Sequence, residues 1–568
     1  RTFGPPYFVH TFARYFGPET GKTNPEYWSL VHGKRDGGQY TGQLCLTNQD
    51  MRRETIRMML QHIRRSRSNA LAEGVPCPVY FDLSQNDGKC FCQCEKCQAM
   101  EKELSVTDIL MDYVNEVAAA VEKVYPDVLV STLAYQATVT PPKKIMPRHN
   151  VVIRLCNKNL TCSSIDAKRF TEYRNSVQQW SGIAKHLMSW DYILNRWPYP
   201  SDMGIQDLCN FYRKNNFDAI FMEMSNSDFE DDCYDMKFWL FAKIMENPDA
   251  DFEMLRQTFL KGYYGAAAPY IDAWRKLVEK AEASTEMPLG SYHRPHGFDF
   301  YTLDELLEAH KLFDEAEKAV RGNRVLETHV MRARAPLNSL TGRRLPRYSQ
   351  LWREKHSGAF PIDRERLAAD MRRIWLADTE RFLPDKVEHA KNMMESEISF
   401  VENMGDTSIQ VPEPAEFNGK TVQHFAASSL TLHSNPCMRL IKDPDAREGC
   451  AFEVLCDRRP DFFALPFEAG CYDTVAARTT LKRSWDKVPQ AKGFQWLHLG
   501  TDNLHQRYYI YLTRSWEIQA SMLNYLAFGG KKLDVWVRLK FEGPMFYPDE
   551  PAEKTSRIVV DSISLVEL

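Results

Sequence analysis

Four residues whose side chains could transfer a proton or orient a substrate stand at or near the ends of apolar runs. Asn86 and Asp87 follow the run PVYFDLS (Pro78 to Ser84), Asp191 lies in HLMSWDYIL, and Glu223 lies in DAIFMEMS. Positioned carboxyl groups act as general acids and bases, and an adjacent amide can hold a polar group of the substrate. Asp87, Glu223, Asn86 and Asp191 are therefore the candidate catalytic residues.

Each of these candidates also has a purely structural alternative. The sequence Asn86-Asp87-Gly88 is a good turn sequence, so Asp87 by itself could form an Asx-turn. A carboxylate in apolar surroundings is costly unless it is paired or its pKa rises, so Glu223 could form a salt bridge inside the core. Asp191 could cap a helix or accept a hydrogen bond from a neighbouring loop.

Aromatic and amide side chains accompany these acids and supply the candidate substrate-binding residues. Aromatic residues make up 12% of the chain, and flat rings of this kind stack on sugars but also fill ordinary cores. Plain core packing is therefore the alternative for Trp190 and Tyr192. The substrate-binding candidates are Tyr135, Trp190, Tyr192, Gln136 and His10.

A cysteine-rich stretch follows Asp87 closely, with the spacing C-x-C-x-C-x-x-C at Cys90, Cys92, Cys94 and Cys97. Structural zinc sites usually combine two separated C-x-x-C pairs, and this tighter cluster fits that pattern poorly. We expect packed free thiols here, with a disulfide or a metal ion as the alternatives. No H-E-x-x-H, G-x-S-x-G or Walker pattern is present, so we expect no metal and no cofactor in the chemistry.

Seven short apolar runs in the first ~225 residues predict the strands that position these side chains. Most of the runs are continuous rather than alternating, which is typical of strands buried on both faces, and amphipathic stretches such as Asp108 to Pro126 separate them. This order predicts an α/β fold with a parallel sheet. The runs are Tyr7 to Phe12, Gln43 to Asn48, Pro78 to Ser84, Val128 to Tyr135, Asn150 to Cys156, His186 to Leu194 and Asp218 to Ser225.

The runs are best explained as strands two to eight of a (β/α)8 TIM-type barrel, with the first strand at or before Arg1. The alternative is an open doubly wound sheet, but no Gly-rich phosphate loop follows any of the runs. In such barrels the chemistry lies at the carboxyl ends of the strands, which is where the candidate acids stand.

The hydrophobic pattern of the rest of the chain changes twice, first to helical spacing and then to short alternating runs, so we predict three domains. Residues 1–295 form the catalytic barrel, 296–405 a helical region packed on it, and 410–568 a C-terminal β-sandwich. Helices are predicted at Thr302 to Val320 and at Ile362 to Leu383. For the sandwich, structural support is favoured over carbohydrate binding.

Length and charge exclude several classes of partner. The 568 residues carry a net charge of -4, with 43% hydrophobic and 26% charged residues, which is ordinary for a globular protein. Without a basic excess, neither nucleic acid nor an anionic membrane is an expected partner. No apolar run approaches the ~20 residues of a membrane-spanning helix. The first residue is Arg1 rather than Met, so we expect a targeting segment upstream.

Several stretches resemble a bacterial family long catalogued as of unknown function and now associated with glycoside hydrolase family 163. They are DLSQNDGKCFCQCEKC, STLAYQATVTPPKKIMPRHNVVIRLC, MSWDYILN and GYYGAAAPYIDAW. The resemblance extends from Asn24 to about Trp274. VRLKFEGPMFY and IVVDSISLVEL resemble the C-terminal sandwich of the same family.

The resemblance implies an endo-β-N-acetylglucosaminidase acting on complex N-glycans of glycoproteins. It implies a retaining mechanism in which the substrate's own 2-acetamido oxygen attacks the anomeric carbon, so the enzyme needs a general acid and a group that orients the acetamido. By analogy with barrels that place this pair after strand four, Asp87 would be the acid/base and Asn86 the acetamido-binding residue. Glu223 and Asp191 are rivals for either role. The cysteines would brace the loop after strand four.

Two other functions stay open at this point. The same barrel could carry an inverting α-glucuronidase, which would need two carboxylates such as Asp87 and Glu223 about 6.5–9.5 Å apart. The chain could also be a non-catalytic glycan-binding protein. The resemblance and a polymeric substrate imply an exported bacterial protein, periplasmic or at the cell surface.

Overall fold

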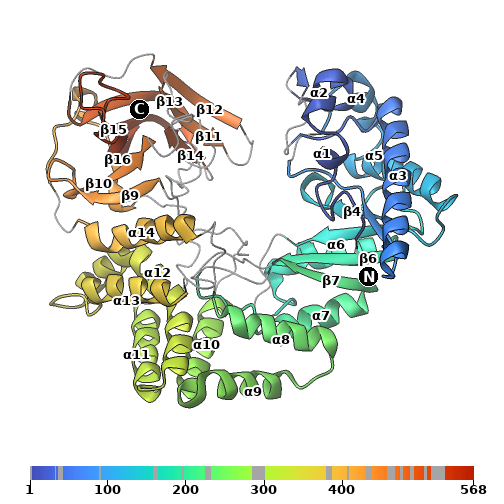
Figure 1. Cartoon of the computed structure of the whole chain (residues 1–568). Coiled ribbons are helices and arrows are strands. Elements are labelled where there is room, and N and C mark those ends of the chain that lie inside the picture. Colours follow the sequence, from blue (N-terminus) through green and yellow to red (C-terminus); the bar gives the residue numbers. More distant parts are fainter. Residues whose placement is uncertain are drawn as a thin grey trace.

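The structure is a computed structural model in which two sheet-bearing parts lie at opposite ends of a group of helices (Figure 1). A curled parallel sheet with its helices forms the N-terminal part, and antiparallel sheets form the C-terminal part. The structure describes residues 3–31, 33–35, 42–88, 91–157, 164–192, 197–223, 232–284, 301–378, 387–405, 409–429, 437–456, 467–473, 478–485, 492–504, 508–512 and 531–568.

Five parallel strands in the order β3-β4-β5-β6-β7 form the N-terminal sheet. The strands are β3 (Tyr80–Asp82), β4 (Leu129–Ala134), β5 (Val151–Cys156), β6 (His186–Tyr192) and β7 (Phe217–Glu223). Their two faces belong to different clusters: Phe81, Ile153 and Leu187 lie in the large core, whereas Val152 and Met188 lie in a separate cluster on the other face. Burial on both faces explains why the runs are continuously apolar.

The complete (β/α)8 barrel that we predicted is not formed by the described residues. Of the seven predicted strands, the last five are present, but the first two are not. Gln43 to Asn48 contributes a single bridge, between Leu44 and Trp28, and then caps a helix. Tyr7 to Phe12 contains no strand and ends in the first turn of α1 (Phe12–Tyr15). The sheet is therefore a partial, curled barrel.

The segment from Phe3 to His10 instead crosses from one edge of this sheet toward the other. Phe3 forms a parallel bridge with Tyr80 of β3, and the Phe8 ring stacks on Trp190 of β6 at 5.9 Å. Side-chain packing, rather than a continuous ladder, thus holds this segment on the sheet, although Tyr7 stays 46% exposed.

Helices cover the outer face of the sheet, and their ends follow from local signals. In α5, Ser105 and Asp108 form a capping box, and Ile109 and Val117 are buried, as the amphipathic pattern of this stretch requires. Val124 lies beyond the helix and is 53% exposed. The helices of this part of the chain are α1, α2 (Pro18–Thr23), which has no buried residue, α3 (Gln49–Glu73), α4 (Glu95–Glu101), α5 (Val106–Glu122), α6 (Thr171–Ser181) and α7 (Ile205–Lys214).

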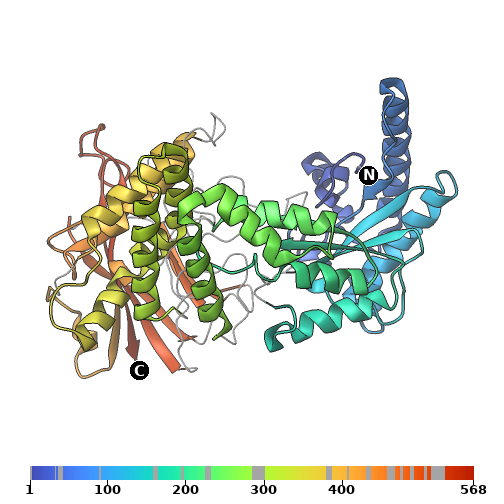
Figure 2. The same cartoon turned by 90° about the horizontal axis from the view of Figure 1, so that it is seen from below.

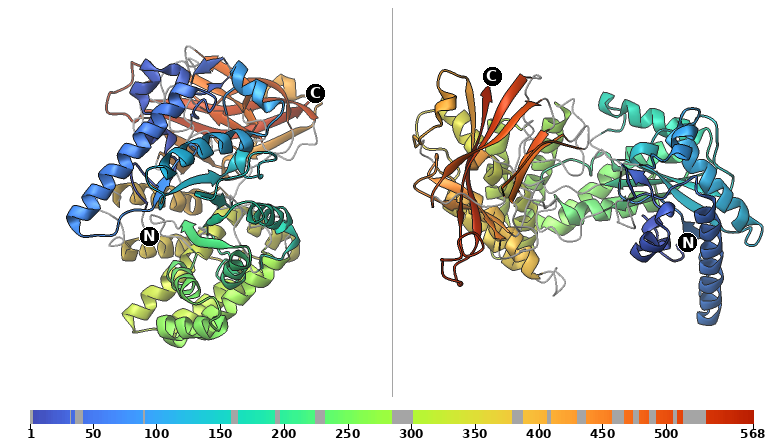
Figure 3. Two further views of the ribbon diagram at one scale, coloured as in Figure 1. Left: turned by 90° about the vertical axis from the view of Figure 1, so that its right-hand side faces the viewer. Right: turned by 90° about the horizontal axis from the view of Figure 1, so that it is seen from above.

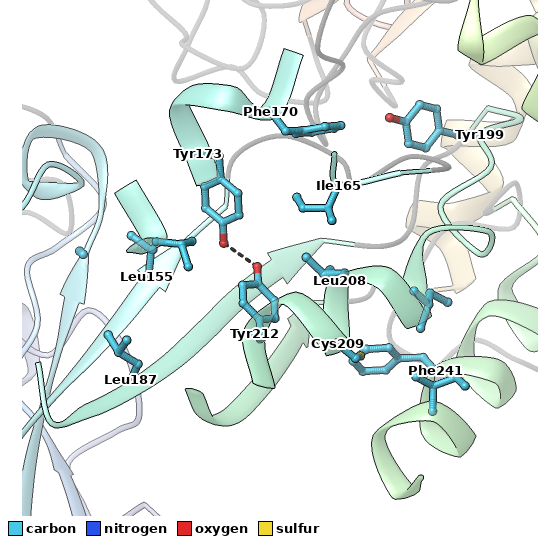
Figure 4. Packing of buried hydrophobic residues seen from close by; sticks show 14 of the residues in the cluster. Leu155, Ile165, Phe170, Tyr173, Leu187, Tyr199, Leu208, Cys209, Tyr212 and Phe241 are labelled. Atoms are coloured by element: carbon cyan, nitrogen blue, oxygen red, sulfur yellow. Dashed lines mark hydrogen bonds between the residues drawn. The ribbon is translucent and has the colours of Figure 1, made fainter. Parts of the chain in front are cut away.

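Figure 4 shows how side chains from these helices fill the outer face of the sheet. Leu155 of β5 and Leu187 of β6 pack near Tyr173 of α6 and Tyr212 of α7, whose hydroxyl groups are 2.5 Å apart. The large aromatic core thus contains a few polar atoms that form hydrogen bonds with one another.

In its described ranges the chain continues with seven further helices. Buried residues of the first five continue the core of the sheet, whereas those of the last two, from Arg364 onward, pack in other clusters. The first two, drawn in green, lie between the two ends of the molecule when it is seen from below (Figure 2). The predicted helix at Thr302 to Val320 is confirmed, with the Thr302 hydroxyl accepting from the backbone N–H of Glu305. The helices are α8 (Tyr234–Glu246), α9 (Phe252–Tyr264), α10 (Ala268–Ala283), α11 (Leu303–Ala319), α12 (Arg324–Lys355), α13 (Arg364–Asp378) and α14 (Val387–Asn403).

The C-terminal strands form two antiparallel sheets that share one hydrophobic cluster, as expected for a β-sandwich (Figure 3). The long strand β16 pairs with β15 on one side and with β10 and β8 on the other. The strands are β8 (Val422–Ala426), β9 (Met438–Lys442), β10 (Cys450–Leu455), β11 (Phe467–Asp473), β12 (Arg478–Trp485), β13 (Gln495–Leu504), β14 (Tyr508–Leu512), β15 (Lys531–Glu542) and β16 (Arg557–Glu567).

The predicted division into domains at 295 and 405 stays a prediction. Phe400 of α14 packs within the sandwich cluster, and α12 contributes both to it and to the core of the parallel sheet. None of the helices in the described ranges combines the length and apolar character that crossing a bilayer requires.

Candidate active site

The carboxyl ends of the parallel strands gather most of the predicted site residues at one edge of the sheet. Asp87 follows β3, Tyr135 and Gln136 follow β4, and Tyr192 and Glu223 are the last residues of β6 and β7. This edge is where parallel α/β sheets place their reactive groups.

Asp87 is exposed and is held by neutral donors from the end of β4. The Tyr135 hydroxyl donates to Oδ1 of Asp87 at 2.9 Å, and Nε2 of Gln136 donates to the same oxygen at 3.3 Å. Burial raises the pKa of Tyr135, and the charge of Asp87 adds to this, so the hydroxyl keeps its hydrogen. Within the described residues no donor reaches Oδ2, which leaves this oxygen available to a ligand.

The end of β4 is fixed by a short network around Gln136. Its φ of 53° lies in the left-handed region, which is unfavourable for a residue with a Cβ and persists only where the surroundings impose it. Thr138 Oγ1 accepts from the N–H of Tyr135 at 3.2 Å, and the Gln85 side-chain amide donates to the carbonyl of Tyr135 at 2.8 Å. Gln85 therefore ties the loop after β3 to the end of β4.

Asn86 is fully buried, and both ends of its side-chain amide contact the backbone. Its Oδ1 accepts from the N–H of Ala13 at 3.0 Å, and its Nδ2 donates to the carbonyl of Gly42 at 2.5 Å. Gln43 in turn accepts from the Asn86 N–H at 3.0 Å and donates to its carbonyl at 2.8 Å. These contacts are those of a residue that positions the Asp87 loop.

His10 lies against the same loop. Its N–H donates to the hydroxyl of Ser84 at 2.8 Å, and its Nδ1 lies 2.7 Å from the carbonyl oxygen of Gln85. Because a carbonyl only accepts, Nδ1 carries the hydrogen, and a neutral ring has its lone pair on Nε2. The ring centroid is 6.1 Å from that of Tyr135, so this histidine lies beside the tyrosine that binds Asp87.

Glu223 is partly buried among aromatic residues at the other side of the site. The indole N–H of Trp190 donates to Oε2 of Glu223 at 2.9 Å. Trp190 is itself fixed by the stacked ring of Phe8, by Phe221 at 4.4 Å and by the guanidinium of Arg154 at 5.5 Å. The orientation of this carboxylate is therefore set by a rigid aromatic group.

A small apolar cluster connects the surroundings of Asp87 with those of Glu223. It includes Trp190, which binds Glu223, and Tyr135, which binds Asp87. The side chains that bind the two carboxylates therefore pack in one cluster, although Asp87 follows β3 and Glu223 ends β7, the two opposite edge strands of the sheet. The cluster consists of Val9, Leu133, Cys156 and Trp190, with Phe8, Tyr135 and Tyr192 packed against it.

A buried ion pair that was not predicted from the sequence lies beneath this site. Asp82, the last residue of β3, contacts Arg154 of β5 and accepts from the hydroxyl groups of Thr11 at 3.0 Å and Ser84 at 2.5 Å. Burial raises the pKa of Asp82, although Arg154 opposes that shift. The sequence does show one charged residue inside each of two continuous apolar runs. Burying an unpaired charge costs free energy, so the two charged residues could have been expected to pair.

Asp191 is separated from the other candidates. Successive residues of a strand face opposite sides, so Asp191 points toward the helices while Trp190 and Tyr192 face the aromatic cluster. It is fully buried, and its Oδ1 accepts from Tyr212 at 2.7 Å and from Asn157 at 3.0 Å. Burial raises the pKa of Asp191 to about 6, against these hydrogen bonds. Grouping Asp191 with Asp87 overlooked this alternation.

The cysteines assemble differently from the predicted run. Cys92, Cys94 and Cys97 meet Cys45, which lies 47 residues before the first of them, and all four are unbridged. Cys90 lies outside the described residues. Within the described part of the chain, this is the one cluster of side chains with the composition and spacing of a metal site.

The chain was compared with known proteins. Residues 1–276 match a family described as a domain of unknown function, DUF4838. No curated protein matches the chain significantly. Among solved structures it is similar to CpGH89 from Clostridium perfringens, determined with two glutamate-to-glutamine substitutions in complex with its substrate GlcNAc-alpha-1,4-galactose. The sequences are 10% identical with a TM-score of 0.33, over 69% of this chain and 45% of the other, so this chain spans less than half of that protein.

Proposed function

We propose that this chain is a retaining endo-β-N-acetylglucosaminidase that cleaves the chitobiose core of complex N-glycans on glycoproteins. The observation that carries the proposal is the exposed carboxylate of Asp87, held by neutral donors, whose partner Tyr135 packs in the same cluster as Trp190, the partner of Glu223. The resemblance to glycoside hydrolase family 163 supports the substrate class. An exported location, periplasmic or at the cell surface, follows from a substrate carried by glycoproteins.

In this proposal Asp87 is the general acid and base. The acetamido oxygen of the substrate attacks the anomeric carbon while the bond to the departing GlcNAc oxygen breaks, and that oxygen takes a proton from Asp87. Water then opens the resulting oxazolinium ion and gives a proton back to Asp87. Because both donors bind Oδ1, Oδ2 is the oxygen that would carry this proton.

Glu223 is the residue to which we assign the acetamido group. Asn86, the predicted candidate, is buried with its amide bound to the backbone, so we assign it the positioning of Asp87. A carboxylate fixed by the Trp190 indole could accept the acetamido N–H and direct its oxygen toward the anomeric carbon. Tyr135, Tyr192 and His10 would contact the sugar.

The first test is mass spectrometry of glycans released from a glycoprotein that carries complex N-glycans. The wild type should release glycans ending in a single GlcNAc, and Asp87→Asn and Glu223→Gln should lose this activity. Asp249→Asn, which removes an exposed carboxylate paired with Arg213, is the matched control and should retain it. Absence of release by the wild type from any N-glycoprotein would contradict the proposal.

A second test separates the two roles. A preformed sugar oxazoline already contains the bond that the acetamido oxygen must make, so Glu223→Gln should hydrolyse it better than it hydrolyses the glycan. Asp87→Asn should remain impaired on both, because water still needs a base. The reverse pattern would exchange the assignments. An inverted anomeric product would instead favour a two-carboxylate mechanism of the α-glucuronidase type.

A further inference from the structure

Four cysteine sulfurs from two separate segments converge beside the Asp87 loop. Cys45 lies ahead of α3, whereas Cys92, Cys94 and Cys97 lie around the start of α4. All four Sγ atoms lie within 4.8 Å of one another. The Cys45 sulfur is 3.7 Å from that of Cys94 and 4.0 Å from that of Cys97.

These distances fit four ligands around one metal ion and do not fit disulfides. A disulfide requires sulfurs about 2.05 Å apart. Zinc bound to thiolates at about 2.3 Å in a tetrahedron holds the sulfurs about 3.8 Å apart. The two measured separations lie on either side of that value.

Donors surround the sulfurs as they surround the thiolates of metal sites. The backbone N–H of Leu30 donates to the Cys92 sulfur at 3.3 Å, and the Thr47 hydroxyl lies 3.2 Å from the Cys97 sulfur. The Arg35 guanidinium lies 4.0 Å from Cys92 and donates to the carbonyl of Trp28 at 2.6 Å. Outer donors of this kind orient the ligands and offset their negative charge.

We propose that Cys45, Cys92, Cys94 and Cys97 bind a zinc ion as a structural tetrathiolate site. Packing of free thiols is the weaker explanation. Cys45, Cys92 and Cys97 form a separate small cluster, and the apolar side chains packed against it are those of Leu30 and Cys94. So little apolar surface would hold these segments together poorly. Four protein ligands also leave no open position on the ion, which is typical of structural sites.

The zinc ion would join the two segments that flank the Asp87 loop. Cys45 is two residues from Gln43, whose side chain binds the backbone of Asn86 on both sides and the carbonyl of Gly88 at 3.0 Å. Cys92 follows Asp87 by five residues. The metal ion would therefore hold in place both the segment around Cys45 and the segment that follows the Asp87 loop.

The test is the metal content of the full chain purified without chelator, by elemental analysis and by native mass spectrometry. We expect one zinc per chain in the wild type and a loss of at least tenfold in zinc occupancy in Cys45→Ser and Cys97→Ser. Cys77→Ser, which changes a partly exposed cysteine outside the cluster, should keep its zinc. Zinc content does not depend on glycosidase activity, so this proposal and the proposed function fail separately.

A measurement on the wild type alone guards against variants that do not fold. Replacing zinc with cobalt should give the sulfur-to-metal charge-transfer and visible bands of a tetrahedral tetrathiolate centre. A chain that lacks zinc after purification and binds neither zinc nor cobalt when reduced would overturn the proposal. Iron in the same site, at one ion per chain, would overturn its assignment to zinc.

Discussion

Two groups of acidic residues in this molecule are built in opposite ways. Between α7, α8 and α10, Asp202 and Asp232 are fully buried with two cations, Arg275 and Lys237. Arg275 donates to both oxygens of Asp232 at 3.0 Å, and Lys237 donates to Asp232 at 2.8 Å and to the carbonyl of Tyr199 at 2.9 Å. Two negative and two positive charges thus balance inside the core.

The two candidate acids at the strand ends receive neutral donors instead. Asp87 is bound by a phenol and an amide, and Glu223 by an indole. A buried cation would keep a carboxylate ionised and shielded from solvent, which suits an ion pair that holds helices together. Neutral donors orient a carboxylate and leave one of its oxygens for a substrate. The partners of an acid, more than its burial, distinguish a structural acid from a candidate for chemistry.

The largest effect is expected at Asp87. Asp87→Asn should lower the rate of glycan release by about 10²- to 10⁴-fold, because general acid–base catalysis contributes about that much. Its free energy of unfolding should change by less than about 0.5 kcal/mol, since the side chain is exposed. Steady-state kinetics and urea unfolding would check this, and a large loss of stability with retained activity would contradict it.

The structural group should respond in the opposite way. Arg275→Met would leave Asp202 and Asp232 buried with Lys237 alone, so we expect about 3–5 kcal/mol of destabilisation in urea unfolding. Arg213→Met is the matched control, because its pair with Asp249 is exposed and should contribute less than about 1 kcal/mol. Equal losses of stability from the two substitutions would show that the buried ion pairs of Arg275 stabilise the fold no more than an exposed ion pair does.

Asp191 lies between the two groups, being buried but bound by neutral donors. Burial raises its folded-state pKa to about 6, above the ~3.9 of an unfolded chain, so its contribution to stability is full below pH ~4 and is lost as the pH rises through about 6. Asp191→Asn cannot ionise. It should gain on the order of 3 kcal/mol relative to the wild type between about pH 4 and pH 7.

Thermal unfolding of both proteins across that pH range would measure this gain. Asn can still accept from Tyr212 and Asn157, so the comparison isolates the charge. Parallel pH profiles of wild type and variant would contradict the assignment.

The smallest effect is expected at Tyr135. Tyr135→Phe removes the stronger of two donors to Asp87 but leaves Gln136 and the apolar cluster in place. The loss should be about 1 kcal/mol, or roughly fivefold in kcat/KM, with unchanged folding. A loss as large as that of Asp87→Asn would assign the phenol a direct part in the reaction.

The sequence predicted burial better than it predicted hydrogen-bond partners. Continuous apolar runs located the five parallel strands, yet Tyr7 to Phe12, also an apolar run, packs Phe8, Val9 and Phe12 against its neighbours without a ladder. Periodicity reports which side chains avoid water, and it cannot say whether a neighbouring strand pairs with the backbone. The partner of the cysteine run, Cys45, is likewise fixed only by tertiary structure.

For the site, position along a strand was informative, but face and pairing were not. Asp87, Tyr135 and Glu223 were located because parallel strands end at one edge. The period of two along β6 would already have placed Asp191 and Trp190 on opposite faces. The ion pair of Asp82 and Arg154 required the sheet order, which brings β3 and β5 to either side of β4.

The two hydrogen bonds from the Gln43 side chain to the backbone of Asn86 decide at which stage the loop beside Asp87 loses its conformational entropy. The Gln43 amide binds the N–H and the carbonyl of one residue, as a neighbouring strand would, although no strand runs there. The backbone beside Asp87 is thus ordered when the chain folds, before any ligand binds. Under the proposed function, less of the binding free energy would then be consumed in arranging Asp87, and more would remain to distinguish the transition state from the bound sugar.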